Sequence, residues 1–185
     1  MAIKRLIVFL SICLLLMSCR EQRDSRELRN FCKETIVIPS GIQMISGRNQ
    51  SFASSRSELP IFVIYHDSLS CNMCQISNLA DITGLYELAD SLDIFEVMTI
   101  FTPKKEEYDS VVKNLMVHDF EYPVYIDFTG SFRKINTGIP DDKRFHSFLI
   151  DSNGHPIFVG DPVASNELWS IFLNTLVSLN DNGIL

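Results

Sequence analysis

Two cysteines, Cys71 and Cys74, have the residue type and spacing to carry chemistry in this chain. They follow an apolar, β-branched run at 61–65 and a polar turn, and they open an amphipathic segment. This pattern predicts a buried strand, a loop, and a helix whose first turn holds both cysteines. Residues three apart share a helix face, so the two sulfurs could meet and form a disulfide. Free N–H groups at a helix N-terminus also favour the thiolate, the reactive form of cysteine.

The same pair has two other interpretations. A Cys-x-x-Cys sequence can be half of a zinc site, but the chain has no second Cys-x-x-Cys and no His-x-x-His. It can also be a structural disulfide in an oxidising compartment. The strand, loop and helix around the pair favour redox chemistry. Of the nearby residues, His66 is expected to be mainly structural, and Cys32 is expected to be a small buried apolar residue.

The elements that must position the two cysteines alternate along the chain. The helix that carries them is predicted to run over 72–92, with apolar residues at helical spacing. Further helices are expected after residues 102–103, near 128–135, and from Ser165 onward. Strands are predicted over 94–101, 124–126, 145–150 and 155–159, the last two forming a hairpin. This alternation predicts an α/β fold in which a mixed sheet is covered on both faces.

The N-terminal region is predicted to have three parts. Two basic residues precede an apolar run that ends in the sequence Leu-Met-Ser-Cys19, which resembles a bacterial lipoprotein signal. The resemblance implies cleavage after residue 18 and lipid attachment at Cys19. Arg20, rather than Asp, follows that cysteine, which slightly favours the outer membrane. Residues 19–34 are then expected to be a polar tether, 35–58 peripheral strands (35–38 and 42–45) and a loop, and 59–180 the main domain.

A Cys-x-x-Cys directly after the first core strand resembles the thioredoxin fold, a three-layer α/β/α sandwich. The segments 122–127, 144–151 and 160–162 look like those of TlpA-like bacterial lipoproteins with a thioredoxin-like domain. The resemblance implies that Cys71 is the nucleophile that attacks a client disulfide. Cys74 would then resolve the mixed disulfide.

Two positions depart from the family pattern. Many of these proteins have Trp before the first cysteine, where this chain has Ser70. The family normally has a cis-proline facing the cysteines, and that place falls at or beside His146 in this chain. Phe145 and His146 are therefore the expected substrate-binding residues.

Together these features predict a membrane-anchored thiol–disulfide oxidoreductase of the bacterial cell envelope, with its domain in the periplasm. Its expected partners are protein thiols or disulfides and a second redox protein, with no cofactor and no metal. The net charge of −7 argues against a nucleic-acid partner. One alternative is metal binding or delivery, with copper as the cargo, through Cys71, Cys74 and His146. Another is a non-catalytic binding module with the thioredoxin fold. Peroxidase activity is disfavoured, because the peroxiredoxin-like branch places a proline before its nucleophile and 64–71 has none.

Overall fold

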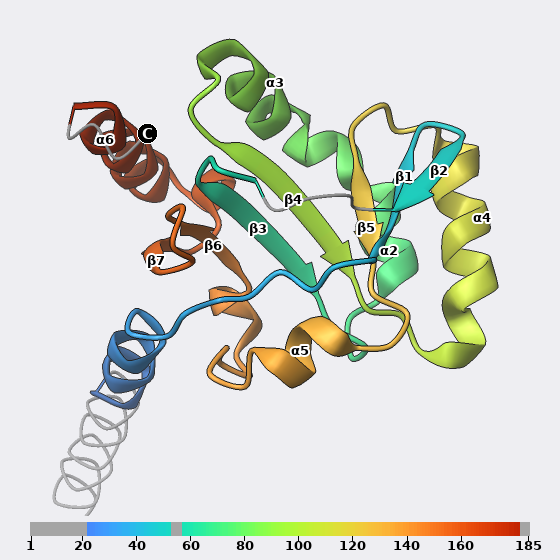
Figure 1. The fold of residues 1–185 in the computed structure, drawn as a ribbon, viewed down its shortest axis with the longest axis horizontal. Helices are drawn as coiled ribbons and strands as arrows, with labels where there is room; N and C mark the ends of the chain where they lie inside the picture. The colour runs from blue at the N-terminus through green and yellow to red at the C-terminus, as the bar shows by residue number, and fades with distance from the viewer. Residues whose placement is uncertain (1–21, 53–56, 182–185) are drawn as a thin grey trace, which may run out of the picture.

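The computed structural model describes residues 22–52 and 57–181, so the predicted signal sequence and Cys19 lie outside the described residues. Seven strands form one mixed sheet in the order β2-β1-β5-β4-β3-β6-β7 (Figure 1). Strands β3, β4 and β5 are parallel, whereas β6, β7, β1 and β2 pair antiparallel with their neighbours. The strands are β1 (Gln43–Ser46), β2 (Asn49–Phe52), β3 (Ile61–His66), β4 (Glu96–Phe101), β5 (Val124–Ile126), β6 (Ser147–Ile150) and β7 (Pro156–Val159).

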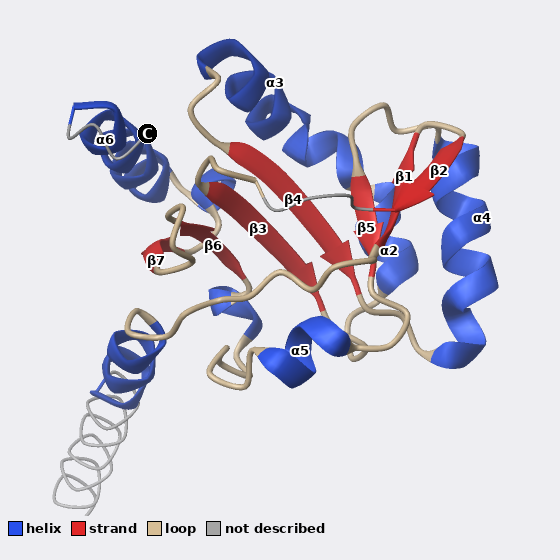
Figure 2. Cartoon of the chain, viewed as in Figure 1, coloured by secondary structure: helices blue, strands red, loops and turns tan. Residues whose placement is uncertain are grey.

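Helices cover both faces of this sheet, as predicted (Figure 2). The α-helices that follow β3 are α2 (Asn72–Ser77), α3 (Thr83–Leu92), α4 (Tyr108–His118), α5 (Ser131–Ile135) and α6 (Asn166–Asp181). One face of β3 carries Phe62 and Ile64, which pack with α3 and α6. The opposite face carries Val63 and Tyr65, which pack with Phe132 of α5. The alternation of buried side chains along β3 therefore explains why both faces need a covering layer.

The sequence prediction was wrong in three places. The helix predicted over 72–92 is interrupted, because α2 ends at Ser77 and a 3₁₀ turn (Leu79–Ile82) precedes α3. The segment 35–38 forms no strand. The N–H of Ile36 instead binds the carbonyl oxygen of Gly154 at 2.8 Å. The predicted loop contains β2, which forms a hairpin with β1 at one edge of the sheet.

The N-terminal stretch that was predicted to be a polar tether contributes to the core. Residues 22–31 are helical, and Phe31 at the end of this helix is 1% exposed. Cys32, which was expected to be buried, is instead an exposed free thiol. The chain turns just after the helix, and this turn directs Phe31 inward and Cys32 toward solvent. The folded part of the molecule therefore begins well before residue 59.

Candidate active site

The two cysteines lie at the start of helix α2, after the short loop that connects it to strand β3. Cys71 is the N-cap residue of α2, and its Sγ accepts a hydrogen bond from the main-chain N–H of Cys74 at 3.3 Å. The two cysteines form a disulfide with their Cα atoms 5.3 Å apart. Both residues are exposed. The disulfide is thus open to attack by an external thiolate, and after reduction the N–H of Cys74 is available to stabilise a thiolate at Cys71.

Helix α2 is oriented by the side opposite its cysteines. Asn72 and Ile76, one turn apart, are 2% and 1% exposed. Ile76 packs in the core with residues of α4 and β5, and the Nδ2 group of Asn72 donates to Glu107 at 3.2 Å. Cys71 and Cys74 are therefore presented on the outer side of the helix. The i, i+4 spacing of the two buried residues is the sequence signal for this orientation.

The loop before Cys71 is built around one carboxylate. Oδ1 of Asp67 accepts hydrogen bonds from the N–H of Leu69 at 3.0 Å and from the hydroxyl of Ser70 at 2.8 Å. Burial favours the protonated form of Asp67, but the Ser70 hydrogen bond and the charge of Lys143 outweigh it, so the pKa of Asp67 lies below its ordinary value. The loop therefore carries a negative charge four residues before Cys71.

Two histidines flank the same end of the sheet. The ring of His66 lies on that of Phe101, with centroids 4.6 Å apart. Burial, together with the repulsion that a second protonated imidazole at His146 would exert, lowers the pKa of His66 from 6.5 to about 4. Burial also lowers the pKa of His146, whose Nε2 lies 2.9 Å from the main-chain oxygen of Pro140. Both imidazoles are therefore neutral at neutral pH, and the structural role expected for His66 agrees with its packing.

The two predicted substrate-binding residues differ in their exposure. His146 is 5% exposed, and its ring packs against Tyr65 with centroids 5.2 Å apart. Phe145 is half-buried beneath the guanidinium of Arg144, which lies 5.4 Å from the ring centroid. Of the two, only Phe145 offers side-chain surface to a client. No cis peptide bond occurs within 22–52 or 57–181, so the described chain has no cis-proline at this loop.

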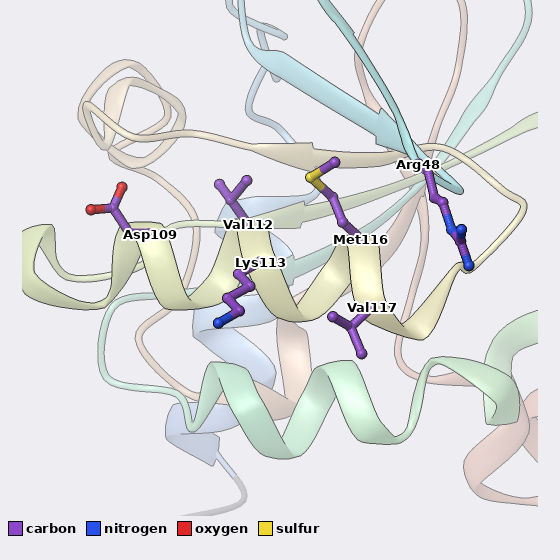
Figure 3. A pocket seen from close by; sticks show the side chains of 6 residues that line it. All are labelled: Arg48, Asp109, Val112, Lys113, Met116 and Val117. Carbon is purple, nitrogen blue, oxygen red and sulfur yellow. The ribbon is translucent and has the colours of Figure 1, made fainter.

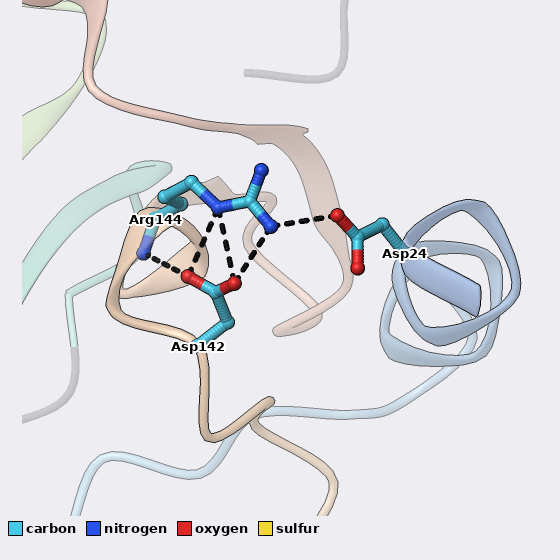
Figure 4. Close-up of polar contacts among 3 residues, drawn as sticks. All are labelled: Asp24, Asp142 and Arg144. Atoms are coloured by element: carbon cyan, nitrogen blue, oxygen red, sulfur yellow. Dashed lines mark hydrogen bonds and ion pairs between the residues drawn. The ribbon is translucent and has the colours of Figure 1, made fainter. Parts of the chain in front are cut away.

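One contact with the loop 67–71, called the active loop below, was not predicted from the sequence. Lys143, from the 3₁₀ turn Lys143–Phe145 that precedes β6, donates to the main-chain oxygen of Leu69 at 3.1 Å. It also lies 3.7 Å from Asp67. The next residue, Arg144, binds Asp142 and, at 2.6 Å, Asp24 of the N-terminal helix (Figure 4). No local pattern identifies such contacts, because their partners lie far away along the chain.

The structure does not assemble the predicted alternative metal site. Among the described residues, no three His, Cys, Asp or Glu side chains are placed to hold a metal ion. His146 directs Nε2 at a carbonyl oxygen, as expected for a histidine that shapes the loop. The arrangement instead suits sulfur chemistry, with an exposed disulfide on a loop fixed by a carboxylate.

Two hollows on the described part of the chain are lined by residues away from the cysteines. One open hollow of about 550 Å³ lies along α4 (Figure 3). Its lining residues are Arg48, Asp109, Val112, Lys113, Met116 and Val117. A second hollow, of about 800 Å³, lies between the 37–43 segment and the start of α5 and also has no residue of the active loop. Cys71 and Cys74 are themselves exposed, so their disulfide is accessible to a macromolecule as well as to a small thiol.

No protein-family model matches the chain, and no curated protein matches it in sequence. Its structure is similar to that of AhpC from Enterococcus faecalis, at 14% identity over 83% of this chain and 96% of the other, with a TM-score of 0.50. It is also similar to the pneumococcal exposed lipoprotein thioredoxin Etrx1 from Streptococcus pneumoniae (17% identity, 76% and 100% coverage, TM-score 0.49). A third similar structure is a putative thiol:disulfide interchange protein DsbE from Chlorobium tepidum (18% identity, 76% and 99% coverage, TM-score 0.46). The similarity to AhpC, together with the sheet order, confirms the predicted thioredoxin-like fold.

Proposed function

We propose that this chain is a thiol–disulfide oxidoreductase that exchanges disulfides with protein clients through Cys71 and Cys74. The observation that carries the proposal is the exposed Cys71–Cys74 disulfide at the start of α2, directly after a central strand of a thioredoxin-like sheet. A disulfide kept only for stability has no need of this exposure. Reactive cysteines, by contrast, must be accessible.

The reaction transfers two electrons from the cysteine pair to the client disulfide. In the reduced protein, the Cys71 thiolate attacks one sulfur of a client disulfide, and the other client sulfur leaves as a thiolate. The Cys74 thiol then loses its proton and attacks Sγ of Cys71, which breaks the mixed disulfide and forms the Cys71–Cys74 disulfide. The client is released with two thiols, and the pair is reduced again by a second redox protein. The reverse sequence oxidises a client.

Location is the second part of the proposal. The leader supports export and lipid attachment at Cys19, which would place the domain at the bacterial cell envelope, facing the periplasm. Arg20 after the cysteine slightly favours the outer membrane. Within the described residues, the helices lack the combination of length and apolarity needed to cross a bilayer.

A trapping experiment tests the exchange reaction. All variants should carry Cys32→Ser, because Cys32 is an exposed free thiol that would give background disulfides. In this background, Cys74→Ala is expected to accumulate mixed disulfides with envelope proteins, since resolution is blocked. Cys71→Ala is the matched control and is expected to trap none. Equal trapping by both variants, or none by either, would favour the non-catalytic binding module.

A further inference from the structure

Lys143 connects two segments that lie far apart in the sequence. Its ammonium donates to the main-chain oxygen of Leu69 at 3.1 Å, across 74 residues of chain. The same ammonium lies 3.7 Å from Oδ1 of Asp67. Both acceptors belong to the short loop that ends at Cys71. Lys143 therefore contacts the active loop without being part of it.

The carboxylate that Lys143 meets is the one around which this loop folds. Oδ1 of Asp67 accepts from Leu69 and Ser70, and its side chain is 17% exposed. In the described part of the chain, Lys143 is the only lysine or arginine within ion-pair distance of Asp67. The negative charge that lies closest to Cys71 along the chain is thus balanced by one cation.

The turn that presents Lys143 is itself held in place. Oδ1 of Asp142 accepts from the N–H of Arg144, and the Arg144 guanidinium binds both Asp142 and Asp24 (Figure 4). The main-chain N–H of Phe145 binds the oxygen of Asp142 at 3.0 Å. Because the backbone on both sides of Lys143 is fixed, its side chain reaches the active loop from a defined position.

We propose that Lys143 is a positioning residue for disulfide exchange at Cys71, an inference that rests on the function proposed above. Disulfide exchange requires a thiolate to approach the sulfur of Cys71 or to form there. Without Lys143, the carboxylate of Asp67 would lack its cation and would oppose negative charge at that sulfur. The loop would also lose its link to the turn before β6. Lys143 thus both fixes the loop and neutralises the charge inside it.

Reduction of the disulfide by dithiothreitol tests the proposal without any client. The rate can be followed in the detergent-solubilised full chain by gel shift after alkylation of the freed thiols. We expect Lys143→Met to slow reduction about three- to tenfold and Lys143→Arg to remain close to the wild type. Lys134→Met is the matched control, because Lys134 is also an exposed lysine that donates to a carbonyl oxygen, that of Thr129.

A second substitution separates charge from simple loss of structure. Asp67→Asn keeps an oxygen that can accept hydrogen bonds from Leu69 and Ser70 but removes the charge. Asp67→Asn combined with Lys143→Met is therefore expected to reduce faster than Lys143→Met alone. The reduction potential of Lys143→Met should also be lower than that of the wild type, by about 30 mV for a tenfold change in the equilibrium constant.

The outcomes distinguish this inference from the proposed function. A wild-type disulfide that dithiothreitol does not reduce would contradict the proposed function itself. A wild type that is reduced, with Lys143→Met within twofold of it, would overturn only the role of Lys143. A double variant slower than Lys143→Met would also overturn it, because a purely structural contact would then account for both effects.

Discussion

The ring of Phe31 meets the ring of Phe148 edge to face, with centroids 5.1 Å apart and planes at 83°. Phe148 lies in β6, two residues after His146, and both phenylalanines are almost fully buried. The N-terminal helix is therefore fixed to the strand that continues from the Lys143 turn. A lipid attached at Cys19 would then be joined to the active-site domain through this helix, whose described part begins at residue 22.

Phe31 should contribute strongly to stability. Phe31→Ala leaves a cavity between the N-terminal helix and β6 and is expected to lower the free energy of unfolding by about 3 kcal/mol or more. Phe52→Ala is the matched control, because the same atoms are removed from a side chain that is 69% exposed. Urea denaturation of both variants measures the difference. Equal, small losses would show that the helix is not packed on the domain.

The low pKa of His66 predicts acid sensitivity. In the unfolded chain the His66 side chain binds a proton below about pH 6.5, whereas in the folded chain it binds one only near pH 4. The free energy of unfolding therefore falls as the pH drops through this window. At about pH 4.5 the loss from His66 would be at most about 2 to 3 kcal/mol. His66→Gln should therefore lose less stability between about pH 7 and about pH 4.5 than the wild type does. His118→Gln, at an exposed position, should behave like the wild type, and identical pH profiles for all three would contradict the account.

His146 distinguishes disulfide exchange from metal handling. The reduced domain is expected to bind Cu(I) and Zn²⁺ weakly, because the ring faces the carbonyl of Pro140. His146→Ala should change the rate of disulfide exchange more than the affinity for either metal. Competition with a chromogenic chelator measures the affinity. Tight, stoichiometric metal binding that His146→Ala abolishes would favour the metal-binding alternative.

Under the proposed lipid attachment, membrane association should depend on Cys19 of the predicted signal sequence. The wild type is expected to partition into detergent and to carry acyl chains, whereas Cys19→Ser should leave an uncleaved or mislocalised precursor. Detergent phase separation measures the partition, and mass spectrometry of the N-terminal peptide measures acylation and cleavage. Soluble, unacylated wild-type protein recovered from the envelope would contradict lipid attachment.

Much of the sheet could be predicted from the sequence because buried strands carry a strong local signal. The runs that became β3 and β4 are apolar on both faces, as parallel strands between two layers of helices must be. The polar turn before Pro156 likewise marked the hairpin of β6 and β7. The cysteine pair could be predicted as the candidate active site from its position between a predicted strand and a predicted helix.

The remaining features depend on tertiary partners. Strand β2 is fully exposed and has no apolar alternation, so pairing with β1 determines it. The segment 35–38 has the composition of a strand, but it hydrogen-bonds to Gly154 and to the side chain of Asn136. The contact of Lys143 with Asp67 joins two loops at one end of the sheet, and no periodicity encodes it.

The redox role of the Cys71–Cys74 pair is tested by its reduction potential in the native protein. It can be measured by equilibration with defined ratios of reduced and oxidised dithiothreitol, with Cys32→Ser included to remove the exposed free thiol. We predict that the pair is fully and reversibly reduced without denaturation, at a potential above about −300 mV, because exchange with clients requires it. A native pair that resists reduction, or whose potential lies well below that value, would rule out disulfide exchange at Cys71 and identify a structural disulfide.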